Sequence, residues 1–115
     1  MRRNANKFIF DMLDSCRFLL ELTKNETIER YKADRVFRRA IERELQIIGE
    51  AMLQLRTLSP KTASEFTEHE RIIGFRHVLV HGYLALDADL VWLVIREKLP
   101  ILRKELEGAL PGEPP

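Results

Sequence analysis

Apolar residues recur every three or four positions along most of the chain, and this periodicity limits the fold more than any other feature. No stretch shows the strict alternation that is typical of a β-strand, and no repeat or linker divides the sequence. One apolar stripe near the start consists of Ile9, Met12, Leu13, Cys16, Leu19 and Leu20. Such spacing places the apolar side chains on one face of an α-helix. The sequence therefore predicts an all-α bundle of four or five helices.

Turn residues predict the limits of the first two helices. The first helix is expected from about residue 4 to residue 24, where the sequence TKNET ends it. The second is expected to end near residue 56 and to begin near residue 26 or near residue 34. Pro60, with Ser59 as its N-cap, then predicts one short helix, because proline suits the first turn of a helix.

Capping patterns also predict the last two helices. Thr67 and Glu70 fit the T-x-x-E capping box, so a third long helix is expected to begin there and to end at Gly82. Asp87 is expected to cap a final helix over residues 88–107. Pro100 removes a backbone donor inside that helix and predicts a kink. A single domain is expected over residues 1–108, followed by a flexible Gly- and Pro-rich tail over residues 109–115.

Composition narrows the class of protein. The chain has 115 residues, and its 19 Lys and Arg against 18 Asp and Glu give a formal net charge of +1. That balance argues against binding duplex nucleic acid by charge alone. The single cysteine, Cys16, excludes an intrachain disulfide and favours the reducing cytoplasm. Because Cys16 lies on the apolar stripe, it is expected to be a core residue. No segment is long and apolar enough for a membrane span.

The second helix has a basic first half, formed by Arg30, Lys32, Arg35, Arg38, Arg39 and Arg43. These cations can be a solvated face that is balanced by nearby glutamates. Alternatively, they can form a flank that attracts phosphate groups. The sequence leaves both interpretations open.

The segment RHVLVHGY, residues 76–83, concentrates the titratable side chains Arg76, His77, His81 and Tyr83. His77 and His81 are four residues apart and share a helix face, as metal ligands often do. However, the H-E-x-x-H pattern is missing and no third ligand is evident, so no metal site is expected. No other cofactor is indicated.

Arginine and histidine together supply what phosphodiester cleavage needs. A guanidinium binds a phosphate through a fork of donors and stays charged. An imidazole can take or give a proton at neutral pH. RNA carries its own nucleophile, the 2′-hydroxyl. The plainer interpretation is that Arg76 forms a salt bridge and the histidines cap the helix end, and spacing alone does not exclude it.

Arg76, His81 and Tyr83 match the pattern R-x4-H-x-Y, which resembles the signature of the HEPN superfamily in its HepT-like toxin branch. LQIIGEA, residues 45–51, and the segment over residues 72–102 also resemble the corresponding helices of that family. The resemblance implies an antiparallel helical bundle that forms a homodimer with the motifs facing a shared cleft. It further implies a metal-independent endoribonuclease that acts as the toxin of a toxin–antitoxin pair. The implied partner is an MNT-type nucleotidyltransferase antitoxin that transfers AMP from ATP to the motif tyrosine.

The resemblance also implies a role for each matching residue. Arg76 would bind and stabilise the phosphate, His81 would act as the acid or base, and Tyr83 would accept AMP. His77 stands where the family often has asparagine, so it would orient the RNA or share the proton transfer. Glu50 could pair with Arg76 across the bundle, and a plain structural ion pair explains it equally well.

Two other functions remain open on the sequence. The chain could be a non-catalytic helical protein that presents a nucleotide or substrate to its partner nucleotidyltransferase. It could also be a structural dimer without chemistry. Retention of both Arg76 and His81 favours the ribonuclease.

Overall fold

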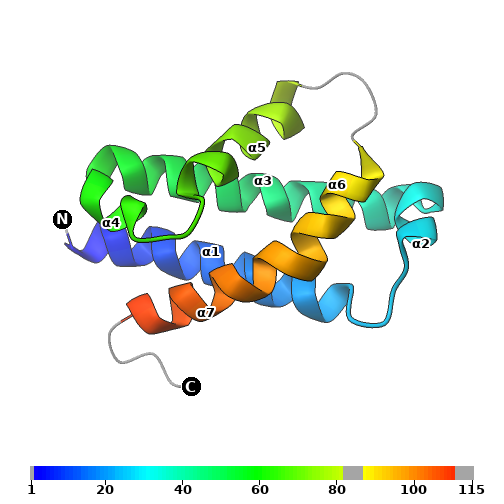
Figure 1. The fold of residues 1–115 in the computed structure, drawn as a ribbon, viewed down its shortest axis with the longest axis horizontal. Coiled ribbons are helices and arrows are strands. Elements are labelled where there is room, and N and C mark those ends of the chain that lie inside the picture. Colours follow the sequence, from blue (N-terminus) through cyan, green and yellow to red (C-terminus); the bar gives the residue numbers. More distant parts are fainter. Residues whose placement is uncertain (1, 82–86, 111–115) are drawn as a thin grey trace.

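Helices α1 (Arg2–Leu22) and α3 (Arg35–Leu58) lie antiparallel at the centre of the bundle (Figure 1). The computed structural model describes the backbone of residues 2–81 and 87–110, and side chains from residue 5 onward within those ranges. Helix α5 (His69–His81) covers α3, and α7 (Leu99–Ala109) runs back along α1. The all-α prediction is confirmed, and the described residues contain no strand. None of the described helices has the length and apolar character needed to cross a membrane.

The apolar stripes meet in one core between α1, α3 and the C-terminal helices. Met12, Leu13 and Leu19 of α1 are fully buried, as the periodicity predicts. Cys16 is also fully buried, and the loss of solvent raises the pKa of its thiol to about 12. The thiol therefore stays protonated, and the prediction of a core cysteine is confirmed.

The basic region, residues 30–43, is divided between two helices, α2 (Ile28–Ala33) and α3, rather than lying on one. Thr27 caps α2 by accepting a hydrogen bond from the Arg30 amide. Asp34 has extended backbone angles and caps α3, because its carboxylate accepts a hydrogen bond from the Phe37 amide at 3.0 Å. The two helix starts that the sequence left open are therefore both used.

The short α4 (Pro60–Ser64) begins with Ser59 as its N-cap, as predicted. The predicted capping box of α5 is wrong. The Thr67 hydroxyl donates to the Glu105 carboxylate of α7 at 2.5 Å, and the Thr67 amide donates to the same carboxylate at 3.0 Å. The Glu68 carbonyl instead accepts hydrogen bonds from the Arg71 and Ile72 amides in the first turn of α5, and Glu68 itself has a φ of 56°. Gly82, the predicted end of α5, lies outside the described residues.

Asp87 caps α6 (Ala88–Leu93), which confirms the predicted start of the last helical region. The expected single helix over residues 88–107 is not uniform. A π-helical turn, η1 (Val94–Lys98), separates α6 from α7 just before Pro100. Helix α7 continues to Ala109, one residue beyond the expected domain end, and residues 111–115 of the predicted tail lie outside the described residues.

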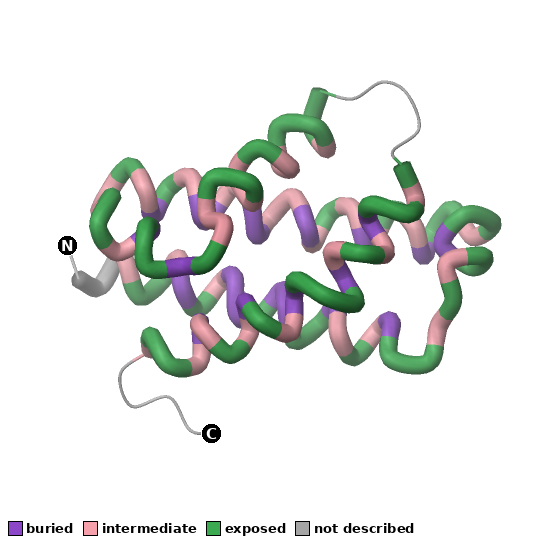
Figure 2. The backbone as a smooth tube through the Cα atoms, in the orientation of Figure 1, coloured by how far each residue is buried: buried purple, intermediate pink, exposed green. Residues whose placement is uncertain are grey.

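Helix α5 is the most exposed of the long helices, and none of its residues is fully buried (Figure 2). Its half-buried residues, among them Ile72, Ile73 and Leu79, pack against the core. Its C-terminal end projects away from the bundle (Figure 1). Helix α5, which carries Arg76 and His81, therefore packs mainly on α3, and the rest of its surface is exposed.

Candidate active site

Arg76 lies where α5 crosses α3, and the crossing depends on Gly49. A Cβ atom added to Gly49 would lie 2.2 Å from the Arg76 Cβ and 3.2 Å from its Cα. Real Cβ atoms essentially never approach other atoms so closely. The absent side chain of Gly49 thus allows the backbone of Arg76 to sit directly on α3. An isolated glycine within a helical pattern is the sequence signal for such a contact.

The Arg76 side chain lines a hollow of about 290 Å³ between α1, α3 and α5. From α1 the lining includes Phe8 and Asp11, and from α3 it includes Glu50 and Gln54. Sequence reasoning did not identify Phe8, Asp11 or Gln54, and no motif marks them. The hollow therefore combines apolar side chains with one arginine, two carboxylates and one side-chain amide.

The Nε atom of Arg76 is buried and has no hydrogen-bond partner among the described residues. A buried donor without a partner costs about 1–3 kcal/mol, and more when the group is charged. Native proteins rarely keep such a donor unless it serves a function or meets a bound molecule. Arg76 therefore stands out among the described residues by one buried donor that the protein itself does not satisfy.

Glu50 does not form the ion pair with Arg76 that the sequence suggested. Its Oε1 atom accepts a hydrogen bond from the side-chain Nε2 of Gln46 at 2.9 Å, and the Nη1 atom of Arg43 lies 3.8 Å from the same oxygen. Glu50 nevertheless lines the same hollow as Arg76. The two residues share a site without being paired to each other.

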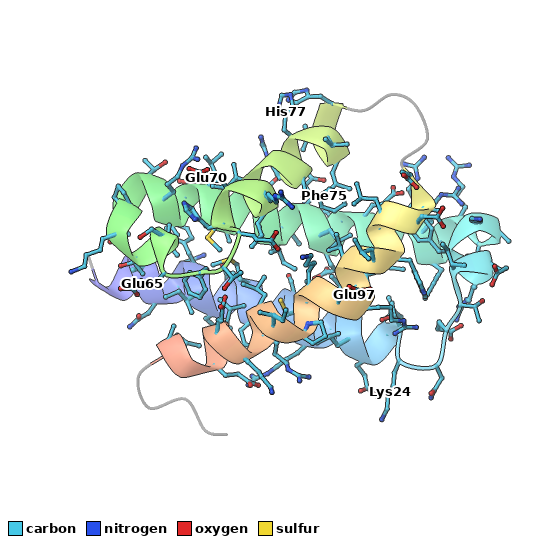
Figure 3. All side chains as sticks on the ribbon, in the orientation of Figure 1. Lys24, Glu65, Glu70, Phe75, His77 and Glu97 are labelled. Atoms are coloured by element: carbon cyan, nitrogen blue, oxygen red, sulfur yellow. The ribbon has the colours of Figure 1, made fainter. Side chains whose placement is uncertain are left out.

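His77 and His81 lie together on the exposed surface of α5. Their ring centroids are 4.6 Å apart and the rings are tilted by 50°. Figure 3 shows His77 at the projecting end of α5, on the side away from the other helices. Neither histidine lines the hollow that holds Arg76. Tyr83, the predicted site of AMP transfer, lies outside the described residues.

Within one chain, the structure thus gathers the site residues into two groups, Arg76 with Glu50 and His77 with His81. In the described part of the chain, no three His, Cys, Asp or Glu side chains gather in a way that could hold a metal ion. Arg76 and His81 are five residues apart, which on an α-helix separates them by about 140°. In the single chain these two residues therefore lie on different sides of α5.

The all-α bundle agrees with the helical fold that the resemblance to the HEPN superfamily implied. The model of the ribonuclease HepT-like family matches residues 12–109. The chain therefore belongs to the HepT-like ribonuclease family, and its enzyme class is that of an endoribonuclease.

Similar proteins span almost the full chain. A protein of Caldanaerobacter subterraneus named as a putative RNase is 33% identical, covering 96% of this chain and 98% of its own. A Methanocaldococcus jannaschii protein with the same designation is 30% identical, covering 92% of this chain and 96% of its own. A probable ribonuclease HepT of Thermococcus cleftensis is 25% identical, covering 93% and 96%. No solved structure matches the chain.

Proposed function

We propose that this protein is a metal-independent endoribonuclease whose catalytic groups are Arg76 and His81, and that it acts as the toxin of a toxin–antitoxin pair. The observation that carries the proposal is the buried, unpartnered Nε of Arg76, whose side chain lines the hollow between α1, α3 and α5. Membership of the HepT-like ribonuclease family supports RNA as the substrate. A scissile phosphate supplies the acceptor that Arg76 lacks.

The reaction uses the nucleophile that RNA carries. A base removes the proton of the 2′-hydroxyl, and the 2′-oxygen attacks the adjacent phosphorus. The bond from phosphorus to the 5′-oxygen breaks, which leaves a 2′,3′-cyclic phosphate and a 5′-oxygen that takes up a proton. His81 exchanges these protons. Arg76 stabilises the charge that builds up on the phosphate oxygens in the transition state.

In the proposed mechanism, His77 supports this proton transfer. Its ring lies within 4.6 Å of the His81 ring, measured between centroids. It can therefore orient His81 or contact the RNA backbone next to it. Both rings are exposed, so a substrate reaches them without a change in the fold.

A homodimer completes the site. An apolar groove of about 450 Å³ lies between α5 and the C-terminal helices. Its lining includes exposed residues that a single chain does not cover, namely Val78, Leu90, Leu93 and Ile101. The rim carries both signs of charge, with Lys98 paired to Glu68 at 3.0 Å. A second copy seated on this face brings the two motif helices together, so that Arg76 of one copy can act with His81 of the other.

An MNT-type nucleotidyltransferase antitoxin silences the enzyme by modifying Tyr83. The phenol oxygen attacks the α-phosphate of ATP, and pyrophosphate leaves. The resulting AMP adds bulk and negative charge two residues from His81. That charge competes with RNA for Arg76, and the bulk closes the approach to the site.

The proposal is tested by incubating tRNA and messenger RNA with purified protein in EDTA. The wild type is expected to cleave, whereas His81→Ala and Arg76→Ala are expected to lose cleavage while remaining folded. Mass spectrometry first establishes that Tyr83 of the wild type carries no AMP. If an unmodified wild type cleaves neither RNA, the ribonuclease proposal fails.

The alternative function is a non-catalytic partner that presents a nucleotide or substrate to the nucleotidyltransferase. It is favoured by one observation, which is that Arg76 and His81 do not line a common hollow in the single chain. An unmodified wild type that binds nucleotide but cleaves no RNA would support it.

A further inference from the structure

Three arginines of α3 follow one another on the face that leads to the Arg76 hollow. Arg35, Arg39 and Arg43 are spaced by four residues and are all exposed. With 100° per residue, these three and Glu50 fall within an arc of about 80°. Each step along the row advances by about 6 Å. The row is called the arginine stripe below, and it continues through Glu50 into the hollow that Arg76 lines.

The structure separates the stripe from the other basic residues of the region. Arg30 pairs with Glu26 at 2.6 Å and lies over the Phe37 ring at 4.2 Å. Arg38 donates to the carbonyls of Tyr31 and Lys32 at the end of α2. These two arginines hold the junction between α2 and α3, so they do not belong to a ligand surface.

The stripe forms few ion pairs. Arg35 and Arg39 have no hydrogen bond or ion pair with any described residue, and the only partner of Arg43 is Glu50 at 3.8 Å. The nearby Glu42 carboxylate accepts a hydrogen bond from the Tyr31 hydroxyl at 2.8 Å and forms no ion pair with the stripe. Arg35 and Arg39 are therefore exposed cations that no carboxylate in the described part of the chain contacts directly.

Like charges four residues apart destabilise a helix. A row of three such cations, of which only Arg43 has an acidic partner, is thus unfavourable in the free protein and becomes favourable when an anion lies along it. Guanidinium groups bind phosphates through two donors at once. A ligand with regularly spaced phosphates, lying along α3, would meet Arg35, Arg39 and Arg43 in turn before it reaches Arg76.

We propose that the arginine stripe is a track for single-stranded RNA, which holds the phosphates of the strand next to the one that Arg76 binds. This inference rests on the proposed ribonuclease function and adds where the substrate runs outside the reacting group. The stripe lies on the solvent side of α3, whereas the apolar groove lies between α5 and the C-terminal helices. A dimer that covers the groove leaves the stripe open to RNA.

The test measures binding of a fully 2′-O-methylated single-stranded RNA, which cannot be cleaved because its nucleophile is blocked. The dissociation constant is determined for the wild type and for Arg35→Gln/Arg39→Gln between about 50 and 200 mM salt. The matched control is Lys24→Gln/Lys104→Gln, which removes the same charge at exposed positions on α7 and after α1. Lys24 lies across the bundle from α5 (Figure 3).

The stripe variant is expected to bind several-fold more weakly at the lower salt concentration. Its slope of log K against log salt should be smaller by about 1.4, because each phosphate contact on a single strand contributes about 0.7. The control should keep the wild-type slope. Equal slopes for the stripe variant and the control would overturn the track and leave the stripe to an acidic protein partner.

Cleavage of unmodified RNA by the same preparations separates this inference from the function on which it rests. A wild type that cleaves, with a stripe variant whose slope is unchanged, would refute only the track. A wild type that neither binds nor cleaves would refute both. A stripe variant that cleaves more slowly at low RNA concentration, but at the wild-type rate at saturation, would support the track, because its loss is one of binding.

Discussion

Replacing Gly49 by alanine tests directly whether the close contact between α3 and α5 at this glycine positions Arg76. The added Cβ would lie 2.2 Å from the Cβ of Arg76 and 3.0 Å from its Cγ, whereas ordinary contact begins near 3.4 Å. No rotamer change relieves this contact, because the Arg76 Cβ and Cα atoms are fixed by the backbone. Helix α5 must therefore move away from α3 by about 1.2 Å in a densely packed contact.

The expected cost follows from two opposing effects. Overpacking of this kind destabilises a protein by about 1–3 kcal/mol. Alanine recovers about 1 kcal/mol of helix propensity relative to glycine. Gly74 of α5 and Gly108 of α7 provide matched controls, since nothing lies within 4 Å of a Cβ added at either position. Gly49→Ala should therefore unfold about 1–3 kcal/mol more easily than Gly74→Ala.

Activity should respond more strongly than stability. A displacement of about 1 Å at a catalytic group can cost about 100-fold in rate. Urea unfolding and single-turnover cleavage of RNA measure the two effects in parallel. The reasoning is refuted if Gly49→Ala gains as much stability as Gly74→Ala and Gly108→Ala and also cleaves RNA at the wild-type rate.

Four further predictions follow from the site and the fold. Mixing inactive Arg76→Ala and His81→Ala proteins, after dissociation and reassociation, should restore about one quarter of the wild-type cleavage if each site draws on both copies of a two-fold dimer; no recovery would show that each chain works alone. Tyr83→Phe should cleave RNA normally but accept no AMP, and transfer of radiolabelled AMP at the wild-type level would refute the assignment of Tyr83. Lys98 lowers the pKa of Glu68 below its usual 4.5. The stabilisation by Glu68 is therefore present above pH 4.5 and is lost as the pH falls through the lowered pKa. The melting temperatures of the wild type and Glu68→Gln should converge in acid, and a constant difference between them would contradict this. Because burial raises the pKa of Cys16 to about 12, iodoacetamide should leave the native protein unmodified at pH 8 and alkylate it in urea.

The periodic apolar pattern was sufficient to predict the bundle. The apolar residues from Ile9 to Leu20 form the buried face of α1, with Leu20 itself half-buried. Ser59 and Asp87 were identified as caps because each supplies a short polar side chain directly before a helix. Asp34 acts by the same rule, yet the basic, charged pattern on both sides of it gave no reason to choose between one helix and two.

Two sequence predictions, the capping box of α5 and the single last helix, did not match the structure. Thr67 matches a capping box locally, but the Glu105 carboxylate of α7 takes both its hydroxyl and its amide. The π-helical turn η1 has no pattern of its own in the sequence. Pro100, two residues beyond it, only predicted that the last helix would be irregular.

The candidate site was predictable in its residue types and not in its arrangement. The motif identified Arg76 and His81. Spacing could not show that Gly49 allows the backbone of Arg76 to approach α3. Nor could it show that Glu50 contacts Gln46 and Arg43. The lining of the hollow comes from α1, α3 and α5 together. Its composition depends on how these helices cross, and that information is not local in the chain.

The most direct test of the central claim compares two substrates of one sequence in EDTA, unmodified RNA and its fully 2′-O-methylated form. If Arg76 and His81 act through the 2′-hydroxyl, the wild type cleaves only the unmodified RNA and its products end in a 2′,3′-cyclic phosphate. Cleavage of the methylated RNA, or cleavage that appears only when a divalent cation is restored, would contradict the mechanism.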